Sequence, residues 1–532
     1  MKLLYKQKCH LAHVAIAQAA IFFIASCTAL GAVAQAPGER VGTPSAALPN
    51  LGDGTDMTPS SERRLGDRIA RELYRDADYV DDAILTEYVQ GIWQPLLAAA
   101  RQRGDVTPEL DEAYAWEVLL GRDRTVNAFA LPGAYLGLHL GLVGVVTSRD
   151  ELASVLAHEL SHVTQRHIAR MMTRQSQQAP WMLGAMILGV LAASKSPNAA
   201  NAMIMGGQAV GAQSQLNFSR DMEREADRVG FGVSSQAGFA PQGFVSMFAK
   251  LQQASRLNDS GNFPYLRSHP LSTERMADMQ SRIDLPDGEP AAQTVGRQNT
   301  QEVDHAMIAA RARVLSNSTV DALRTWTLEV AAASRGRQSL AQQAAALYGA
   351  TLAAIRLRDF TEAQVLWVRL GEQVRGDAAS ARLARLLGAE LMLAKGDGAR
   401  ALELLNGGKA VNAKPNRVEL FLTAQAKLHT SSGLDAVAQD LRVWVAAHPR
   451  DAQAWQMLSG TYVAQGRILS SIRAQAEVSA AHLDYTAALS RFKAAQDWAR
   501  RDGAAADHYE ASIVDTRTRQ IELLVREQAL ER

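Results

Sequence analysis

The chain is poor in cysteine: it has only Cys9 and Cys27, both near the N-terminus. They fall in a segment that has the pattern of a removable export signal, so the exported chain is expected to have no disulfide. Its stability must then come from burial of an apolar core and from bound metal. Export into a bacterial envelope is the simplest destination for such a chain.

The chain also has no large excess of one charge: it has 56 Lys and Arg residues and 55 Asp and Glu residues, for a formal net charge of +1. A balanced chain does not indicate nucleic acid or another polyanion as a partner. Hydrophobic residues make up 47% and charged residues 21%, which is ordinary for a globular protein. At 532 residues the chain is too long for one core, and its length predicts two or three domains.

After the N-terminal segment, no apolar run reaches the roughly 20 residues that a membrane-spanning helix requires. At the N-terminus, lysines precede an apolar run over residues 14–30, and Ala32-Val33-Ala34 forms a small-x-small cleavage site. This pattern predicts a signal peptide over residues 1–34 and a periplasmic location. The alternative is a lipoprotein anchored through Cys27, because residues 24–27 read as a lipobox.

Residues 35–57 are rich in Pro, Gly, Ser and Asp and are expected to form a flexible leader. Order is expected to begin at Thr58-Pro59, a helix-start pair. The periodicity then predicts two helices, three short strands and a further helix from Ser148. The two helices are placed at residues 60–75 and 81–101, the second disturbed by Pro95, and the strands at residues 113–121, 125–133 and 134–143.

The helix from Ser148 carries the stretch SVLAHELSHVTQRHIAR, residues 154–170. His158 and His162 lie one turn apart on one helix face, the geometry in which two imidazoles reach one zinc ion. Glu159 is offset by one step, where it can take a proton from water at the metal. Because H-E-x-x-H also arises by chance on ordinary helices, a third ligand is required.

A candidate for the third ligand lies in SRDMEREADRVG, residues 219–230, another segment with helical periodicity. Glu223 would complete a His, His, Glu set with one open position, the pattern of a catalytic zinc site. Asp227, one turn further on, can accept the outer N–H of a ligating histidine and fix its tautomer.

HELSH followed by EREAD resembles the gluzincin peptidases related to the CAAX prenyl proteases, and NAFALPG and SHPLSTERM match the same family. With the export signal and the helical tail, the chain is similar to the BepA-like periplasmic metalloproteases. The resemblance implies an α+β fold: a mostly α-helical zincin-type domain with a small β-sheet over residues 58–290, then an all-α solenoid of tetratricopeptide-like (TPR-like) repeats over residues 301–532. It also implies one zinc ion per chain.

By this resemblance, residues 127–143 form the edge strand along which an extended substrate peptide pairs. The alternative is a strand that only supports the motif helix. Ala134 stands where the family often has a second glycine, which puts the tightness of that turn in doubt. The expected substrate-binding residues are Asn127, Ala128, Phe129, Gly133, Ala134 and Tyr135.

Three further histidines stay open. The resemblance implies that His269 can approach the metal as a fourth ligand and hold the enzyme latent, but it could instead bind substrate or be a plain loop residue. His167 would point 140° away from His162 on an ideal helix, which favours a structural or supporting role over a ligand. His139 is expected to be an ordinary strand residue whose ring could line the cleft.

Between the two metal motifs, residues 181–211 contain two apolar stretches joined by SKSPN, which suggests a helical hairpin. The first stretch, residues 181–193, is too short to cross a bilayer. The hairpin either packs against the repeat domain or forms a lid that touches substrate or the membrane surface.

The carboxyl part is helical in pattern, and small residues recur within its apolar stretches at Gly349, Gly388, Ala424 and Ser459. In the best unit, Trp455, Leu458, Tyr462 and Gly466 fall where a tetratricopeptide repeat places its W-x-x-L, Tyr and turn glycine, and Pro449 closes the preceding unit. An irregular helical domain without true repeats is the alternative.

Together these features predict a zinc endopeptidase of the periplasm. By resemblance, it would cleave misfolded or stalled outer-membrane proteins, assist their assembly, and dock the barrel-assembly machinery through the repeats. The alternatives are a chaperone or adaptor with latent proteolysis, and a lipoprotein peptidase without assembly partners.

Overall fold

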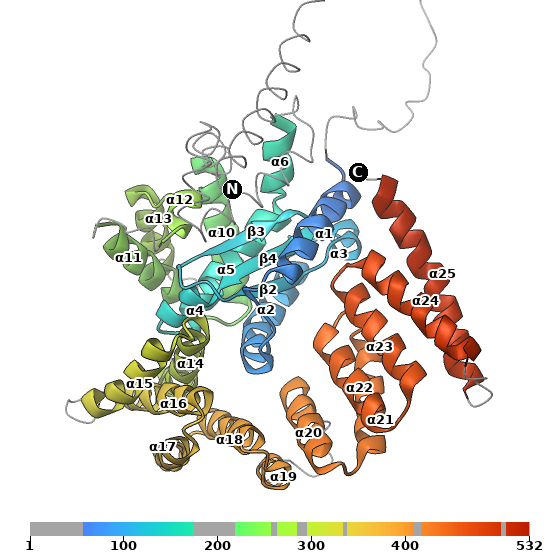
Figure 1. Cartoon of the computed structure of the whole chain (residues 1–532). Coiled ribbons are helices and arrows are strands. Elements are labelled where there is room, and N and C mark those ends of the chain that lie inside the picture. Colours follow the sequence, from blue (N-terminus) through green and yellow to red (C-terminus); the bar gives the residue numbers. More distant parts are fainter. Residues whose placement is uncertain are drawn as a thin grey trace, which may run out of the picture. The chain divides into compact units, whose positions relative to one another are not determined.

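The computed structural model describes seven segments of the chain, which are coloured in Figure 1. These are residues 57–174, 219–256, 263–284, 295–333, 338–407, 416–501 and 507–530. The predicted signal peptide, the leader up to residue 56 and the predicted hairpin at residues 181–211 lie outside them. No helix in the described segments combines the length and the apolar character needed to cross a membrane.

Two helices open the described part of the chain: α1, Pro59–Arg75, and α2, Ala83–Arg103. The Thr58 side chain caps α1 by accepting a hydrogen bond from the Ser61 amide, and Pro59 fills the first turn. Both helices were predicted, although α2 continues through Pro95 to residue 103. One face of α2 is fully buried in the core, and it includes Leu85, Ile92, Trp93 and Leu96.

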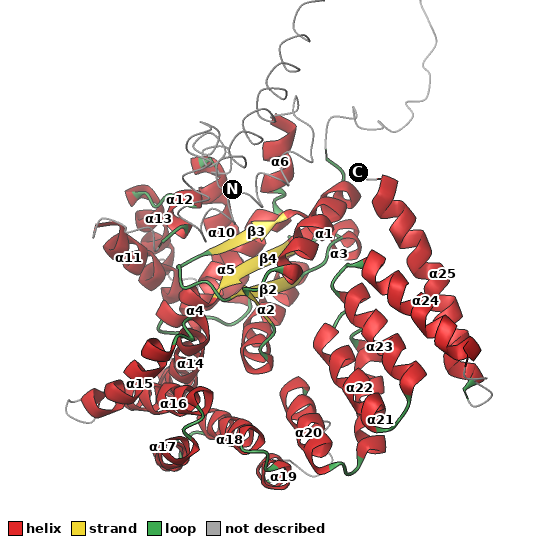
Figure 2. Ribbon diagram, in the orientation of Figure 1, coloured by secondary structure: helices red, strands yellow, loops and turns green. Residues whose placement is uncertain are grey.

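A mixed four-stranded sheet, drawn yellow in Figure 2, has the order β1-β2-β4-β3. Parallel pairing joins β2 to β4, and antiparallel pairing joins β1 to β2 and β3 to β4. Among the described residues, β1 and β3 are therefore the two edge strands of this sheet. The strands span Tyr79–Val80 (β1), Glu117–Gly121 (β2), Ala128–Leu131 (β3) and Tyr135–His139 (β4).

The strand prediction for residues 134–143 was wrong in its second half, because Leu140–Val145 is a helix, α4. Leu140, Leu142 and Val143 are fully buried, and α4 packs on α14, Val295–Ser316. A short run that is apolar on every side suits a buried helix as well as a buried strand, so alternation alone could not decide. The start of the strand prediction at residue 113 was also too early, because Pro108–Ala113 is a helix, α3.

The motif helix is α5, Arg149–Thr164, and it packs on α2, α10, α11 and β3. The other helices of the first part are α6 (His167–Arg174), α10 (Arg220–Gln236), α11 (Gln242–Arg256), α12 (Tyr265–Ser268) and α13 (Thr273–Asp284). An α+β domain with a small sheet is therefore present, as predicted.

The second part is wholly helical within the described segments, and each helix from α15 onward packs on the next. After α14 come α15 (Val320–Ala333), α16 (Leu340–Leu357), α17 (Phe360–Gln373), α18 (Ala378–Ala394), α19 (Gly398–Asn406), α20 (Arg417–Thr430), α21 (Leu434–Ala447), α22 (Ala452–Ala464), α23 (Ile468–Ala481), α24 (Tyr485–Arg501) and α25 (His508–Leu530). A helical region thus follows the α+β domain, as expected.

The recurring small residues of this region lie where helices approach closely. A Cβ at Gly349 would lie 2.5 Å from the Trp326 ring, and a Cβ at Gly388 would lie 2.5 Å from the Trp367 ring. Ser459 instead bonds to Ser471 on the neighbouring helix, at 3.0 Å between hydroxyl oxygens. The spacing therefore marks real helix contacts, while the assignment to tetratricopeptide repeats and the boundary near residue 300 stay predictions.

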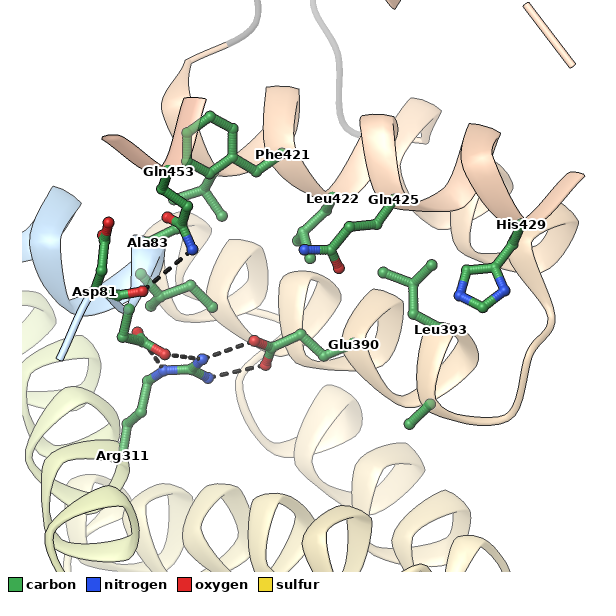
Figure 3. A pocket seen from close by; sticks show the side chains of 14 residues that line it. Asp81, Ala83, Arg311, Glu390, Leu393, Phe421, Leu422, Gln425, His429 and Gln453 are labelled. Atoms are coloured by element: carbon green, nitrogen blue, oxygen red, sulfur yellow. Dashed lines mark hydrogen bonds and ion pairs between the residues drawn. The ribbon is translucent and has the colours of Figure 1, made fainter. Parts of the chain in front are cut away.

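Arginines of the helical region bind acidic residues at the start of α2. Figure 3 shows Arg311 with its guanidinium toward Glu390. Its guanidinium is 2.6 Å from Asp82 Oδ2 and 2.7 Å from Glu390 Oε1. Arg417 binds Asp81 in a similar way at 2.9 Å. The Arg311 bonds line a cavity of about 370 Å³ beside α20. Both arginines fix the N-terminus of α2 to helices far along the chain.

Candidate metal centre

The motif helix α5 is buried along its whole second half, and His158, Glu159 and His162 are each at most 2% exposed. The Ser148 side chain caps its N-terminus by accepting a hydrogen bond from the Glu151 amide. One helical turn brings the Nε2 atoms of His158 and His162 to 3.0 Å from each other. The predicted pair therefore shares one point in the interior.

Helix α10 brings Glu223 to the same point. Glu223 Oε1 lies 3.4 Å from His162 Nε2, and Glu223 Oε2 lies 3.6 Å from His158 Nε2. Close approach of the two helices depends on Gly230, where a Cβ would lie 3.0 Å from the Ala157 carbonyl oxygen and 3.1 Å from the His158 amide nitrogen. The predicted third ligand is thus near both imidazoles.

His269, whose role was left open, joins this group from the end of α12. Its Nδ1 lies 3.0 Å from Glu223 Oε1 and 3.3 Å from His158 Nε2. The ring stacks on Tyr265, with centroids 4.6 Å apart and planes at 30°. His158, His162, Glu223 and His269 each offer one donor atom, and these atoms all lie within 4.8 Å of one another.

An acidic residue and an arginine hold the outer side of His158. Asp227 Oδ1 lies 2.9 Å from His158 Nδ1, the outer nitrogen of that ring. Arg275 binds both oxygens of Asp227, at 2.6 and 2.8 Å, and reaches Glu223 Oε2 at 2.8 Å. Arg275 was not predicted as a site residue, and its only sequence signal was the SHPLSTERM match.

His167 lies against the outer side of His162, with Nδ1 atoms 2.9 Å apart. The expected 140° separation does not apply, because α5 ends at Thr164, Arg166 has a left-handed φ of 52°, and α6 begins at His167. His167 Nε2 in turn lies 3.0 Å from Glu225 Oε2. Glu225 was not predicted, although EREAD contains it.

The chemistry of this donor set fits a metal cation. Two imidazole nitrogens and a carboxylate face one another in a buried space, an arrangement that suits a cation between them. Burial opposes ionisation of Glu223, but nearby His269 and hydrogen bonds from the histidines hold its pKa well below the usual value. Burial lowers the pKa of His162, so this imidazole is neutral and can donate a lone pair.

Glu159 lies beside the four donors and not among them. Its Oε2 accepts a hydrogen bond from the Ala130 amide at 2.9 Å, and its Oε1 lies 3.4 Å from His269 Nε2. Burial raises the pKa of Glu159 above its usual value. A carboxylate held by one oxygen, with a raised pKa, is suited to take up a proton through the other.

Of the predicted substrate-binding residues, Ala128 and Phe129 lie in the edge strand β3, and Asn127 directly precedes it. The His139 amide donates to the Asn127 carbonyl, so in this antiparallel register the main-chain groups of Ala128 and Ala130 point away from β4. The Ala130 amide is the one that reaches Glu159. Within the described residues, the side of β3 that pairs with no other strand therefore runs past the metal centre, with Ala128 buried and Ala130 partly exposed.

The prediction was wrong for the second half of this segment. Gly133 and Ala134 form a 3₁₀ turn with left-handed φ values of 71° and 61°, and Tyr135 lies in β4 between two other strands. The Tyr135 hydroxyl instead donates to Asp67 at 2.8 Å. His139 is also in β4, where its Nδ1 lies 2.9 Å from the Thr125 hydroxyl. The turn forms with alanine in place of the second glycine.

Comparison with known proteins agrees with this geometry. Residues 88–283 match the family model of peptidase family M48. This segment is an M48 peptidase domain. It contains all four clustered donors, so the resemblance drawn from HELSH and EREAD is confirmed.

The similarity to known proteins covers more residues than the M48 domain. The chain is 31% identical to the β-barrel assembly-enhancing protease of Escherichia coli over 324 residues, 60% of this chain and 61% of that protein. It is 28% identical to the protein of the same name from Yersinia pestis over 433 residues, 81% and 83% of the two chains. The chain is also 28% identical to the mitochondrial metalloendopeptidase OMA1 of Saccharomyces cerevisiae over 196 residues, 36% of this chain and 54% of that protein. The chain thus spans less than two thirds of the length of the Escherichia coli relative.

Proposed function

We propose that the chain is a zinc-dependent endopeptidase with one zinc ion bound by His158, His162 and Glu223. The observation that carries this proposal is the convergence of their donor atoms with Glu159 directly beside them. Two imidazoles and one carboxylate are the usual protein ligands of a catalytic zinc ion. The M48 domain and the relatives named as proteases support the same conclusion.

When bound, the zinc ion supplies Lewis-acid activation of water and of the scissile carbonyl. Glu159 takes the proton from the attacking water through Oε1 and passes it to the leaving amine. Ala130 keeps the other carboxylate oxygen in place during this transfer. Asp227 holds the His158 ring, and Arg275 keeps Asp227 ionised.

The edge strand β3 is the proposed binding site for substrate. An extended peptide can pair with the outward carbonyl of Ala130, in the partly exposed half of the strand, which gives affinity with little dependence on sequence. Such a peptide would lie alongside Glu159, since the Ala130 amide already contacts that side chain. Unfolded polypeptide is therefore the substrate class.

The relatives' name motivates the biological part of the proposal: cleavage and assisted assembly of outer-membrane proteins in the periplasm. Export by the predicted signal peptide, or a lipid anchor on Cys27, would bring the chain there. Docking to the barrel-assembly machinery through the helical region, and membrane contact through residues 181–211, belong to the same proposal.

A second function, a chaperone or adaptor with latent proteolysis, is favoured by the position of His269. With His269 as a fourth donor the metal has no open position, which is typical of structural zinc sites. The two functions differ in whether removal of this imidazole releases activity.

The test measures zinc content and cleavage of denatured casein in the wild type, Glu159→Gln, His269→Ala and the control His448→Ala, an exposed histidine. We expect about one zinc ion per chain in every protein, and loss of cleavage in Glu159→Gln. Cleavage by Glu159→Gln at the wild-type rate, or a wild type that holds no transition metal, would overturn the peptidase proposal.

The two functions are separated by His269→Ala. Activity that appears only in His269→Ala supports a latched protease, and inactivity in both the wild type and His269→Ala supports the adaptor.

A further inference from the structure

The two histidines of the motif helix have different outer partners. His158 Nδ1 meets a carboxylate, Asp227, at 2.9 Å. His162 Nδ1 meets another imidazole, His167, and the carboxylate of Glu225 comes one step further out, at 3.0 Å from His167 Nε2. The support of His162 is therefore a chain of two side chains.

The hydrogen-bond direction along this chain is set from its outer end. A carboxylate only accepts, so His167 Nε2 carries a proton and donates it to Glu225. In a neutral imidazole the other nitrogen then has a lone pair, so His167 Nδ1 accepts and His162 Nδ1 donates. His162 Nε2 is left with its lone pair toward His158 and Glu223.

The opposite direction would disable the site. If the neutral His167 ring carried its proton on Nδ1, it would donate to His162 Nδ1, and His162 would then carry its own proton on Nε2. That proton would point at the other donors and exclude a cation. Glu225 favours the productive direction, because its carboxylate accepts the proton of Nε2 and so leaves the lone pair of the neutral ring on Nδ1.

The chain runs from the interior to the surface. The side chains of His162 and His167 are 0% exposed, Glu225 is 28% exposed, and Arg170 is 44% exposed. Arg170 Nη1 binds the same Glu225 oxygen that His167 uses, at 2.9 Å. Helix α6 thus contributes both His167 and Arg170, and α10 contributes Glu225 two residues after the proposed ligand Glu223.

We propose that His167 and Glu225 are positioning residues, which fix the tautomer and the ring orientation of His162 for binding the metal. The inference rests on the proposed role of His162 as a ligand. Neither residue contacts the proposed reacting atoms, so their effect must pass through His162. Outer partners of metal ligands commonly contribute about 10- to 100-fold to metal affinity.

The test uses the full chain and four variants: His167→Leu, Glu225→Ala, the double variant, and the control Asp221→Ala. Asp221 is on the same helix as Glu225, and its carboxylate is 86% exposed. Zinc affinity is measured by competition with a chromophoric chelator, and the visible spectrum of the cobalt-substituted protein reports the geometry of the donor set. Folding of each variant is checked by circular dichroism.

We expect His167→Leu to weaken zinc binding about 10- to 100-fold and to shift the cobalt bands. Glu225→Ala should weaken binding less, and it should have no further effect once His167 is replaced, because the two act in series. Asp221→Ala should match the wild type. If His167→Leu does not fold, the zinc affinity and the cobalt spectrum of Glu225→Ala, a substitution nearer the surface, still test the positioning role.

Two results separate the inference from the proposed function. Unchanged affinity and unchanged cobalt bands in Glu225→Ala and in folded His167→Leu would overturn the positioning role while the wild type still binds zinc. Independent, additive effects of the two substitutions would overturn it as well. A wild type that binds no zinc would instead remove the proposed function itself.

Discussion

The main-chain amide of Ala130 donates a hydrogen bond to the side chain of Glu159, with 2.9 Å between nitrogen and oxygen. The edge strand and the proposed base are therefore joined directly. Glutamine can keep this bond through its carbonyl oxygen, but it cannot take up a proton. We predict that Glu159→Gln melts within a few degrees of the wild type, binds zinc and loses about 10²- to 10⁴-fold in kcat. Calorimetry measures the melting temperature, metal analysis the zinc content, and steady-state cleavage the kcat. A loss of zinc in this variant would contradict the separation of base from ligands.

The close approach of α10 to α5 depends on Gly230. In Gly230→Ala the new methyl group would lie 3.0 Å from the Ala157 carbonyl oxygen, so one helix must shift. We predict a loss of about 1 to 3 kcal/mol in unfolding free energy, together with weaker zinc binding, because Glu223 is on the shifted helix. Gly460→Ala is the matched control, since its Cβ would meet nothing within 4 Å inside α22. It should be neutral or stabilising. Denaturant unfolding of both variants with and without zinc measures the loss in unfolding free energy and the part of it that depends on zinc.

Arg311 is 3% exposed and lies between two carboxylates, Asp82 and Glu390. Replacement by methionine leaves both acids partly buried without their counter-charge. We predict a loss of about 3 to 5 kcal/mol in unfolding free energy. Arg400→Met should cost about 0 to 1 kcal/mol, because its pair with Glu403 is exposed. Equal melting temperatures for the two variants would contradict this account.

Asp304 gives a prediction for pH dependence. Burial raises the pKa of Asp304 to about 6, from an ordinary value of 3.8. The folded state therefore disfavours the ionised form, and this residue makes the protein less stable as pH rises from about 4 to 6. Because the group is only partly buried, we predict that Asp304→Asn gains about 1 to 2 kcal/mol at pH 7.5 and little at pH 4.5. Asp321→Asn, at an exposed position, should gain nothing at either pH. Urea unfolding at both pH values tests the difference.

Removal of the metal should destabilise the fold. The proposed ligands come from α5, α10 and the end of α12, so an ion ties these segments together. Zinc at about 1,000 times its dissociation constant would add about 4 kcal/mol to the unfolding free energy. We predict a lower melting temperature after chelation, restored by zinc and not by magnesium. A melting temperature that does not respond to chelation would contradict a tightly held ion.

The sequence predicted those parts of the fold and site that follow from local periodicity. His158, Glu159 and His162 share one helix, and Asp227 is one turn from Glu223 on another. The relative positions of residues on the same helix could therefore be worked out from the sequence. The positions of Arg275 and Glu225 depend on how α13 and α10 pack, which no single-helix pattern contains. The sequence predicted that His167 points away from His162, because the spacing of apolar residues does not show that the helix ends before the left-handed Arg166. The predicted third strand failed at α4 for a related reason: burial on every side removes the alternation that separates strand from helix.

His305 of α14 lies between two elements of the M48 domain. Its Nε2 is 2.9 Å from the Val146 carbonyl oxygen, just before the motif helix, and its Nδ1 is 2.6 Å from the Tyr88 hydroxyl of α2. The apolar core is likewise continuous from α2 through α14 into α20. A fragment cut after α13 would therefore expose α4 and lose a tether beside its own catalytic helix. Exchange of helical regions between such peptidases should preserve activity only when α14 is kept with the peptidase half.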